Sequence, residues 1–333
     1  MSMWLVFSLS ASGIILAGIR LAPFGAALGR HLKIGQGWIG LIFLATLTSI
    51  PEMTTTITGA SIGAPNIAIG NALGSNLFNV AIVGVLDVLL MRRRPGSFLA
   101  SVRHYHTISG GTAILLTALA IVGIAWRPGV SILGIAPISL LILIAYVAGV
   151  FLVFRAEKDD ENCEKEFAPD LSLAASLAGF VLCGAIIVVS GVFLVRASKE
   201  IAVSTGVSAS FMGAILVAIV TSLPELSASV GALRIQAHDM VVGNIFGSNM
   251  FNILTIFFAD AAFRRGSILS ALGEGATDQL LVAGCGIILT GIAVVAIGAR
   301  ARRHILGIGA DSIVLLAVYF AVTAVIIGRG IKL

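Results

Sequence analysis

Charge is what this sequence has least of. Charged residues make up 11% of its 333 positions, whereas a soluble globular domain carries about 25%. Hydrophobic residues make up 58%, and apolar runs recur from one end of the chain to the other. Several of these runs have the roughly 20 residues that a helix needs to cross a bilayer. The composition therefore excludes an ordinary soluble protein and predicts an integral membrane protein.

Further absences narrow the function. The three cysteines, Cys163, Cys183 and Cys285, are scattered without CxxC spacing, which excludes a disulfide framework and a cysteine metal site. No HExxH motif is present and all five histidines fall near span ends or in loops, so the spans offer no recognisable catalytic metal motif for a membrane enzyme. The N-terminus, MSMW, has no basic stretch before its apolar run. We therefore expect that run to be a membrane span and not a cleaved signal peptide.

The apolar runs predict an all-α protein with ten transmembrane helices. We place these spans at 4–28, 36–62, 66–90, 105–125, 130–154, 172–196, 209–236, 239–263, 277–299 and 309–328. The strongly polar stretch RAEKDDENCEKEFAPD at 155–170 holds seven of the sixteen acidic residues. Because blocks of charge are usually disordered, we interpret 155–171 as an acidic cytoplasmic linker between the units 1–154 and 172–333.

The two units are copies of one ancestral unit. GNALGSNLFN at 70–79 returns as GNIFGSNMFN at 243–252, and the same offset relates TSIPE at 48–52 to TSLPE at 221–225. We call this spacing, from position 70 to position 243, the repeat offset. Between 48–79 and 221–252, 13 of 32 positions are identical without gaps. Five spans per copy is an odd number, so the second copy enters the membrane from the opposite side. We expect two inverted five-helix repeats, a transporter architecture with its substrate site near the membrane midplane.

Each copy has a Pro-Glu pair in the middle of a span, Pro51-Glu52 and Pro224-Glu225. A proline removes a backbone N–H and clashes with the carbonyl four residues earlier, so both helices should be kinked and present free carbonyl oxygens. A carboxylate inside the bilayer costs about 2.5 kcal/mol or more. No Lys or Arg lies near either glutamate within its span, so a bound cation is the natural partner.

Hydroxyl side chains accompany these acids at helical spacing. Two hydroxyl residues precede each glutamate, by four and by three positions, and one serine precedes the last asparagine of each Asn-rich motif by four positions. At these spacings the hydroxyl shares a helix face with the glutamate or asparagine that follows it. The groups are Thr48 and Ser49 with Glu52, Thr221 and Ser222 with Glu225, Ser75 with Asn79, and Ser248 with Asn252. Kinked helices 2, 3, 7 and 8 would bring these groups together at the core. All are hard oxygen ligands, which suit calcium, magnesium, manganese or sodium and disfavour zinc or copper.

The Gly-Asn-x-x-Gly-Ser-Asn pattern has a second interpretation. Glycines four residues apart allow close helix packing, and asparagines form hydrogen bonds between helices. Its duplication at one offset, each time following a Pro-Glu pair, favours the ion site. The roles of Asn71, Asn76, Asn244 and Asn249 stay open between bracing the helices and contacting the ion. Asp87 and Asp260, which share the same offset, are expected at the membrane interface.

Basic residues are distributed unequally between the two sides of the membrane. Fourteen Lys and Arg residues fall on the side that receives the loops after spans 1, 3, 5, 7 and 9, and seven fall on the other. By the positive-inside rule the first side is cytoplasmic, and both termini are extracytoplasmic. This distribution explains the net charge of +5 without a nucleic-acid partner. We expect a multi-pass protein of the plasma (cell inner) membrane.

These motifs resemble those of the cation/calcium antiporter superfamily, specifically its sodium/calcium exchanger branch of prokaryotic type with two alpha-repeats. The resemblance rests on TSIPE…GNALGSNLFN and TSLPE…GNIFGSNMFN and extends over nearly the whole chain through the ten-span layout. It implies alternating access, with spans 1 and 6 sliding against the remaining bundle. It implies ion ligands at Glu52, Asn79, Glu225 and Asn252, from the hydroxyls of Thr48, Ser49, Ser75, Thr221, Ser222 and Ser248, and from the backbone of Ala45 and Ala218.

Two features of the sequence depart from the family pattern. Leu47 and Val220 stand where many relatives have Gly before Thr-Ser-x-Pro-Glu, which makes the backbone there less pliable. Some relatives carry Asp at one of the two positions held here by Asn79 and Asn252. With two asparagines the site has a formal charge of −2 from its glutamates, which balances one divalent ion and argues against potassium co-transport.

The leading hypothesis is a secondary antiporter, not an enzyme, that exchanges calcium or a similar divalent cation for sodium. It needs no cofactor, because calcium and sodium are its substrates. A proton-coupled cation exchanger stays open, since Glu52 and Glu225 could carry protons instead of binding sodium. A passive channel and a membrane enzyme fit the broken midplane helices less well. The sequence leaves the oligomeric state undetermined.

Overall fold

A computed structural model shows an almost entirely helical chain. The structure describes residues 2–90, 97–126, 135–158, 168–205, 220–263, 266–300, 304–305 and 308–328. Its elements, in chain order, are α1 (Met3–Leu32), α2 (Gln36–Trp38), η1 (Ile39–Leu44), α3 (Ala45–Thr48), α4 (Ile50–Ser61), α5 (Pro65–Leu90), η2 (Leu99–Ser101), α6 (His106–Trp126), α7 (Pro137–Lys158), α8 (Leu173–Thr205), α11 (Leu223–Arg234), α12 (His238–Ala262), η5 (Ser270–Gly275), α13 (Ala276–Ala299), β1 (His304–Ile305), β2 (Ile308–Gly309) and α14 (Ala310–Gly328). Within these residues the only strands are β1 and β2, a two-residue antiparallel pair.

Seven helical segments in the described part of the chain are long and apolar enough to cross a membrane. They are α1, α5, α6, α7, α8, α12 and the η5–α13 segment. The segments Gln36–Thr48 and Ile50–Ser61 form an eighth if the bent pair is one span. The remaining two expected spans correspond to α14, which is shorter, and to α11, which follows residues 206–219 outside the described residues. The fold is therefore that of a multi-pass helical membrane protein.

The second span is broken next to its proline. The segments on either side of Ser49 meet at an angle of 48°, and Ser49 itself has φ −93° and ψ 8°. Pro51 is the second residue of α4, where a proline is tolerated because the first N–H groups of a helix have no helical acceptor. Ser222 has nearly the same backbone conformation, φ −89° and ψ 9°, directly before α11, whose second residue is Pro224. Both prolines thus begin a new helix.

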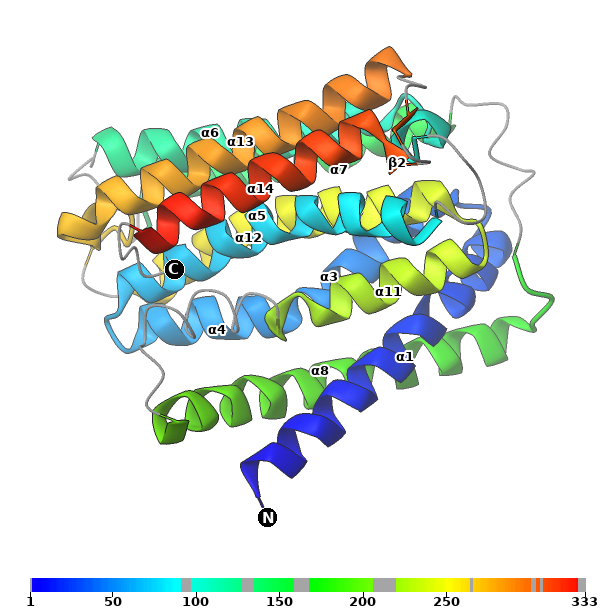
Figure 1. The fold of residues 1–333 in the computed structure, drawn as a ribbon, viewed down its shortest axis with the longest axis horizontal. Coiled ribbons are helices and arrows are strands. Elements are labelled where there is room, and N and C mark those ends of the chain that lie inside the picture. The colour runs from blue at the N-terminus through cyan, green and yellow to red at the C-terminus, as the bar shows by residue number, and fades with distance from the viewer. Residues whose placement is uncertain are drawn as a thin grey trace.

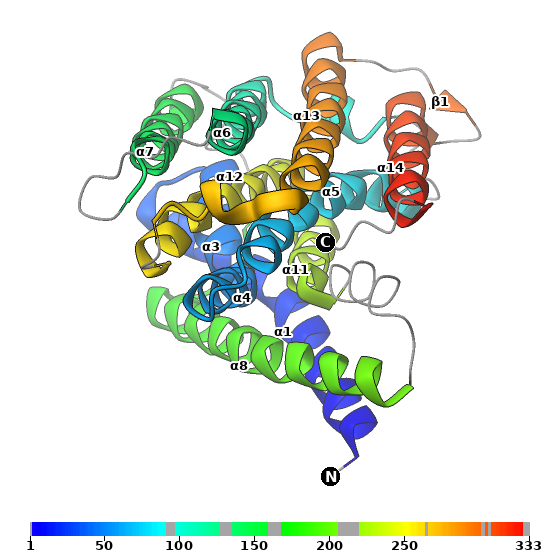
Figure 2. The same ribbon diagram turned by 90° about the vertical axis from the view of Figure 1, so that its left-hand side faces the viewer.

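The kinks expected in the third and eighth spans are not present. α5 and α12 are each one continuous α-helix, so that prediction is wrong. Neither helix has a proline in its interior, and Pro65 occupies the first position of α5, where it causes no break. Both helices lie at the centre of the molecule (Figure 2) and are the most buried of the long helices.

The helices form three layers. α6, α7, α13 and α14 lie on one side of the central helices α3, α4, α5, α11 and α12, and α1 and α8 lie together on the other side (Figures 1 and 2). α1 packs closely on α11, because a Cβ atom added to Gly18 would collide with Ser227 and one added to Gly231 would collide with the backbone of Ile19. α8 packs mainly on α1, and its main contacts with the central layer are with α3 and α4.

Polar contacts join several helix ends at one end of the molecule. The backbone N–H of Trp38, in α2, donates to the carboxylate of Glu157 near the end of α7 at 3.0 Å, and the Tyr105 hydroxyl donates to the same oxygen at 2.8 Å. Arg103, before α6, forms an ion pair with Asp239 of α12 at 3.3 Å. Glu157 is buried, so it anchors the start of the broken second span to α7.

Candidate ion-binding site

Glu52 and Glu225 lie directly after the two breaks, each in the first turn of its helix. Both are fully enclosed, with 1% and 0% of their surface exposed. The unpaired N–H groups and the dipole at a helix N-terminus favour a negative group there. The two carboxyl groups are also near enough to interact electrostatically. The chain therefore brings two carboxylates from different repeats to one enclosed place.

Hydroxyl groups from the opposite repeat surround these carboxylates. The Ser49 hydroxyl donates to Glu225 Oε1 at 2.8 Å, so a residue of the first break reaches the acid of the second. Thr48 approaches Asn244 Oδ1 at 3.4 Å and Ser248 Oγ at 3.5 Å. Thr221 is a neighbour of Glu52. The structure thus joins most of the hydroxyl residues predicted from the sequence into one cluster with the glutamates.

Several buried oxygen atoms in this cluster have no hydrogen-bond partner among the described residues. They are both carboxylate oxygens of Glu52, Oε2 of Glu225, Oγ of Ser222, and Oδ1 of Asn79 and Asn252. An unsatisfied buried polar atom costs about 1–3 kcal/mol, and more when it is charged. No described Lys, Arg or His forms an ion pair with either glutamate. A hard cation, which binds oxygen ligands, would satisfy these atoms and balance the carboxylate charge.

One asparagine braces the chain just beyond each break. Asn71 Nδ2 donates to the Glu52 carbonyl at 3.1 Å and to Thr56 Oγ1 at 3.0 Å. Asn244 Nδ2 donates to the Glu225 carbonyl at 3.2 Å. It also donates to Ser229 Oγ at 3.1 Å. The sequence left this role open, and the structure assigns the amide nitrogens of both residues to bracing. Thr56 and Ser229 were missed, although they are related by the repeat offset.

A second amide network joins α5 and α12 at the molecular centre. Asn76 Nδ2 donates to the Asn249 carbonyl at 3.1 Å, and Asn249 Nδ2 donates to the Asn76 carbonyl at 3.3 Å. Asn252 Nδ2 donates to Asn76 Oδ1 at 3.1 Å, which leaves Asn252 Oδ1 without a partner. The amide dipole of Asn252 is thus oriented with its oxygen free for a ligand. Both Asn79 amide atoms lack partners among the described residues.

The remaining predicted site residues are placed differently. The Ala45 carbonyl accepts from the Ser49 N–H at 3.0 Å and from the Thr48 hydroxyl at 3.3 Å. Ser75 is buried, but its side chain makes no hydrogen bond to either glutamate in the part of the chain that the structure describes. Ala218 lies outside the described residues.

Asp87 and Asp260 are buried within the protein near the ends of α5 and α12. Asp87 accepts from the N–H groups of Phe98 at 3.0 Å and Gly309 at 2.8 Å. Asp260 accepts from Ile268 and from Ala136, both at 2.7 Å. Each aspartate therefore ties the end of its central helix to two other chain segments. The bonds from Gly309 and Ala136 are equivalent under the repeat offset, whereas those from Phe98 and Ile268 are not.

Comparisons with known proteins agree with this arrangement. The family model described as sodium/calcium exchanger protein matches residues 2–155 and 175–328. A putative antiporter, CaxA, from Alkalimonas amylolytica is 29% identical over 81% of this chain and 83% of its own. The sodium/calcium exchanger MaX1 from Methanosarcina acetivorans is 27% identical over 72% of this chain and 76% of its own. Among solved structures, the sodium-calcium exchanger NCX_Mj has the same fold, with a TM-score of 0.73, 22% identity, and coverage of 97% of this chain and 99% of that one.

Proposed function

We propose that this chain, which belongs to the sodium/calcium exchanger family, is a secondary antiporter that exchanges calcium for sodium. The observation that carries the proposal is the set of unpartnered buried oxygens around Glu52 and Glu225. We assign calcium to the pair of glutamates, with Asn79 and Asn252 as amide ligands. Thr48, Ser49, Ser75, Thr221, Ser222, Ser248 and the carbonyls of Ala45 and Ala218 complete the ion positions.

Charge balance gives the exchange its logic. Two ionised glutamates carry −2, which one calcium ion or two sodium ions neutralise. Neutral hydroxyl and amide oxygens outnumber the carboxylates, so the site offers more oxygen positions than two sodium ions need. We infer that more than two sodium ions load and that each cycle moves net charge across the membrane.

We further propose ten spans arranged as two inverted repeats, with alternating access to the shared site. The proposal is supported by hydrogen bonds that recur at the repeat offset, from Asn71 and Asn244 to the glutamate carbonyls and from Gly309 and Ala136 to Asp87 and Asp260. Inverted repeats that meet at a midplane site are a common transporter architecture, in which one part rocks or slides against the other. α1 and α8 are the moving layer in this proposal.

The orientation is proposed from charge. The fourteen-to-seven excess of basic residues puts the α7–α8 connection in the cytoplasm and both termini outside, in the plasma (cell inner) membrane. The contacts of Trp38 with Glu157 and of Arg103 with Asp239 gather the expected cytoplasmic connections at one end.

The decisive experiment is calcium uptake into proteoliposomes under an imposed sodium, potassium or proton gradient. An outward sodium gradient should drive uptake, and a positive vesicle interior should speed it because net positive charge leaves as calcium enters. One elementary charge across 100 mV is worth about 2.3 kcal/mol. Uptake that follows an outward proton gradient and ignores sodium would establish the proton-coupled alternative, and uptake without any counter-gradient would indicate a passive channel.

A further inference from the structure

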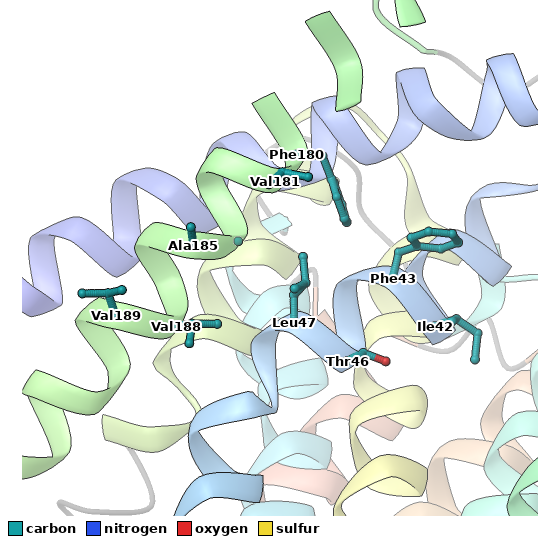
Figure 3. A pocket seen from close by; sticks show the side chains of 10 residues that line it. Ile42, Phe43, Thr46, Leu47, Phe180, Val181, Ala185, Val188 and Val189 are labelled. Atoms are coloured by element: carbon teal, nitrogen blue, oxygen red, sulfur yellow. The ribbon is translucent and has the colours of Figure 1, made fainter. Parts of the chain in front are cut away.

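Two hollows follow each other between α8 and the broken second span, on either side of the point where Gly191 of α8 packs against Pro51 of α4; together we call them the groove. The larger hollow, of about 600 Å³, is lined by η1 and α3 on one side and by α8 on the other. Figure 3 shows Leu47 between the two helices, with Phe43 and Phe180 at one end. The rings of Phe43 and Phe180 meet edge to face at 6.1 Å, so they close that end. The lining is apolar apart from the Thr46 hydroxyl.

The hollow opens onto the surface that faces hydrocarbon. Val181 and Val189 line it and are 59% and 56% exposed. They belong to a stripe of exposed apolar residues along α8, namely Leu173, Leu177, Val181, Leu182, Ile186, Val189 and Phe193. In a membrane this stripe is covered by lipid chains, because nothing else there can cover a large apolar surface. The hollow is continuous with this lipid-facing surface.

The groove changes character toward the end of α8. A second hollow, about 210 Å³, lies between α4 and the residues Val192, Val195 and Arg196. Thr58 and Arg196 supply polar groups to its wall, and no described acidic residue forms an ion pair with Arg196. Along both helices the apolar hollow comes first and the polar hollow follows beyond the Gly191–Pro51 contact, so the pair of hollows offers an apolar body and a cationic end.

The dimensions match one leaflet of a bilayer. At 1.5 Å per residue, Val189 lies about 10 Å and Ala185 about 16 Å below Arg196 along the axis of α8. One hydrocarbon leaflet is about 15 Å deep, half of the bilayer core. A phosphate bound at Arg196 would therefore direct its acyl chain into the apolar hollow. Arginine is the side chain best suited to bind phosphate.

We propose that this groove binds one glycerophospholipid, with its phosphate at Arg196 and an acyl chain between α8 and η1–α3. The bound lipid lies across the contact that α8 makes with α3 and α4, where Gly184 packs on Leu47 and Gly191 packs on Pro51. Where the proposed transport cycle requires α8 to slide along α4, the lipid must leave or shift. Lipid occupancy then controls the rate of transport. That last step rests on the proposed function, whereas the binding itself does not.

Binding is measured on the whole purified protein by native mass spectrometry during titration with phosphatidylglycerol. Arg196→Gln should weaken retention of the first lipid about tenfold, since a charge-assisted hydrogen bond is lost. Ala185→Trp should also weaken it by filling the hollow. The matched controls are Arg234→Gln, at the end of α11, and Leu182→Trp, on the lipid-facing stripe outside the groove, and both should retain lipid like the wild type. Inorganic phosphate should not compete, because the acyl chain supplies much of the affinity.

Equal retention in all five proteins would overturn the lipid site, and so would full competition by inorganic phosphate. The same titration on Glu52→Gln separates the two proposals. Lipid should bind that variant normally whether or not it transports calcium, so a failure of the exchanger hypothesis would leave the lipid result intact. Because the lipid must leave or shift during the cycle, calcium uptake by Arg196→Gln should be faster than by Arg234→Gln, and equal rates would contradict the control of rate by this groove.

Discussion

Replacing Asn244 by alanine should damage the ion site far more than the equivalent change in the other repeat. Asn244 and Asn71 make the same two hydrogen bonds, to the carbonyl of a site glutamate and to a hydroxyl four residues after it. Asn244 is fully buried, whereas Asn71 is half-buried. Water therefore compensates for the lost amide at position 71 and does not reach position 244.

The magnitude follows from what each truncation leaves behind. In Asn244→Ala the Glu225 carbonyl and the buried Ser229 hydroxyl lose a donor, and each unsatisfied buried group costs about 1–3 kcal/mol. The Ser229 hydroxyl recovers part of this by bonding to its own helix, so we expect a loss of about 2–4 kcal/mol for Asn244→Ala and about 1 kcal/mol for Asn71→Ala. About 1.4 kcal/mol corresponds to a tenfold change in affinity. If the difference between the two variants also lowers the free energy of calcium binding, it is therefore measurable as a change in calcium affinity.

Both variants should be compared by thermal unfolding in detergent and by the calcium dependence of uptake into proteoliposomes. Asn244→Ala should unfold at lower temperature and need more calcium for half-maximal uptake than Asn71→Ala. Equal effects, or a larger effect of Asn71→Ala, would refute the argument that burial decides the cost of losing these braces.

Three further predictions concern other parts of the molecule. Asp260→Ala should lower the free energy of unfolding by about 3 kcal/mol, since two buried N–H groups lose a charged acceptor; Asp260→Asn should lose less, and identical melting curves for both would contradict this. Glu157→Ala should destabilise the protein by about 2 kcal/mol because the Trp38 N–H and the Tyr105 hydroxyl lose their acceptor. Glu157→Gln keeps an acceptor oxygen and should recover most of the loss, so equal instability of the two variants would refute the role of Glu157 Oε1 as that acceptor. In a variant without Cys183 and Cys285, a membrane-impermeant thiol reagent should label Cys163 only after cells are opened, and labelling of sealed cells would reverse the orientation.

The repeat in the sequence identified several of the groups that the structure brings together around Glu52 and Glu225. The repeat offset identified the two Pro-Glu pairs, and proline geometry predicted a break beside Pro51. The hydroxyls of Thr48, Ser49 and Ser248 lie in the site because helical spacing puts them there. These features are local consequences of residue type, which a single sequence records directly.

Other features depend on contacts between distant parts of the chain. Asn71 and Asn79 are both asparagines on one helix, yet one braces Glu52 and the other has an unpartnered amide. Spacing alone does not separate these roles. Glu157 reaches Trp38 across 119 residues, and no local pattern announces that contact. A symmetric sequence also gives no sign that α1 packs closely on α11, whereas α8 packs mainly on α1.

Equilibrium binding of radioactive calcium to the purified protein tests the central claim most directly. The wild-type protein should bind one calcium ion per chain, and sodium should displace it. Glu52→Gln and Glu225→Gln should each abolish binding while the protein still folds, whereas Glu157→Gln, which changes a buried acid outside the site, should bind calcium normally. Calcium bound by either folded site variant with wild-type affinity would contradict the assignment of the ion to this pair of glutamates.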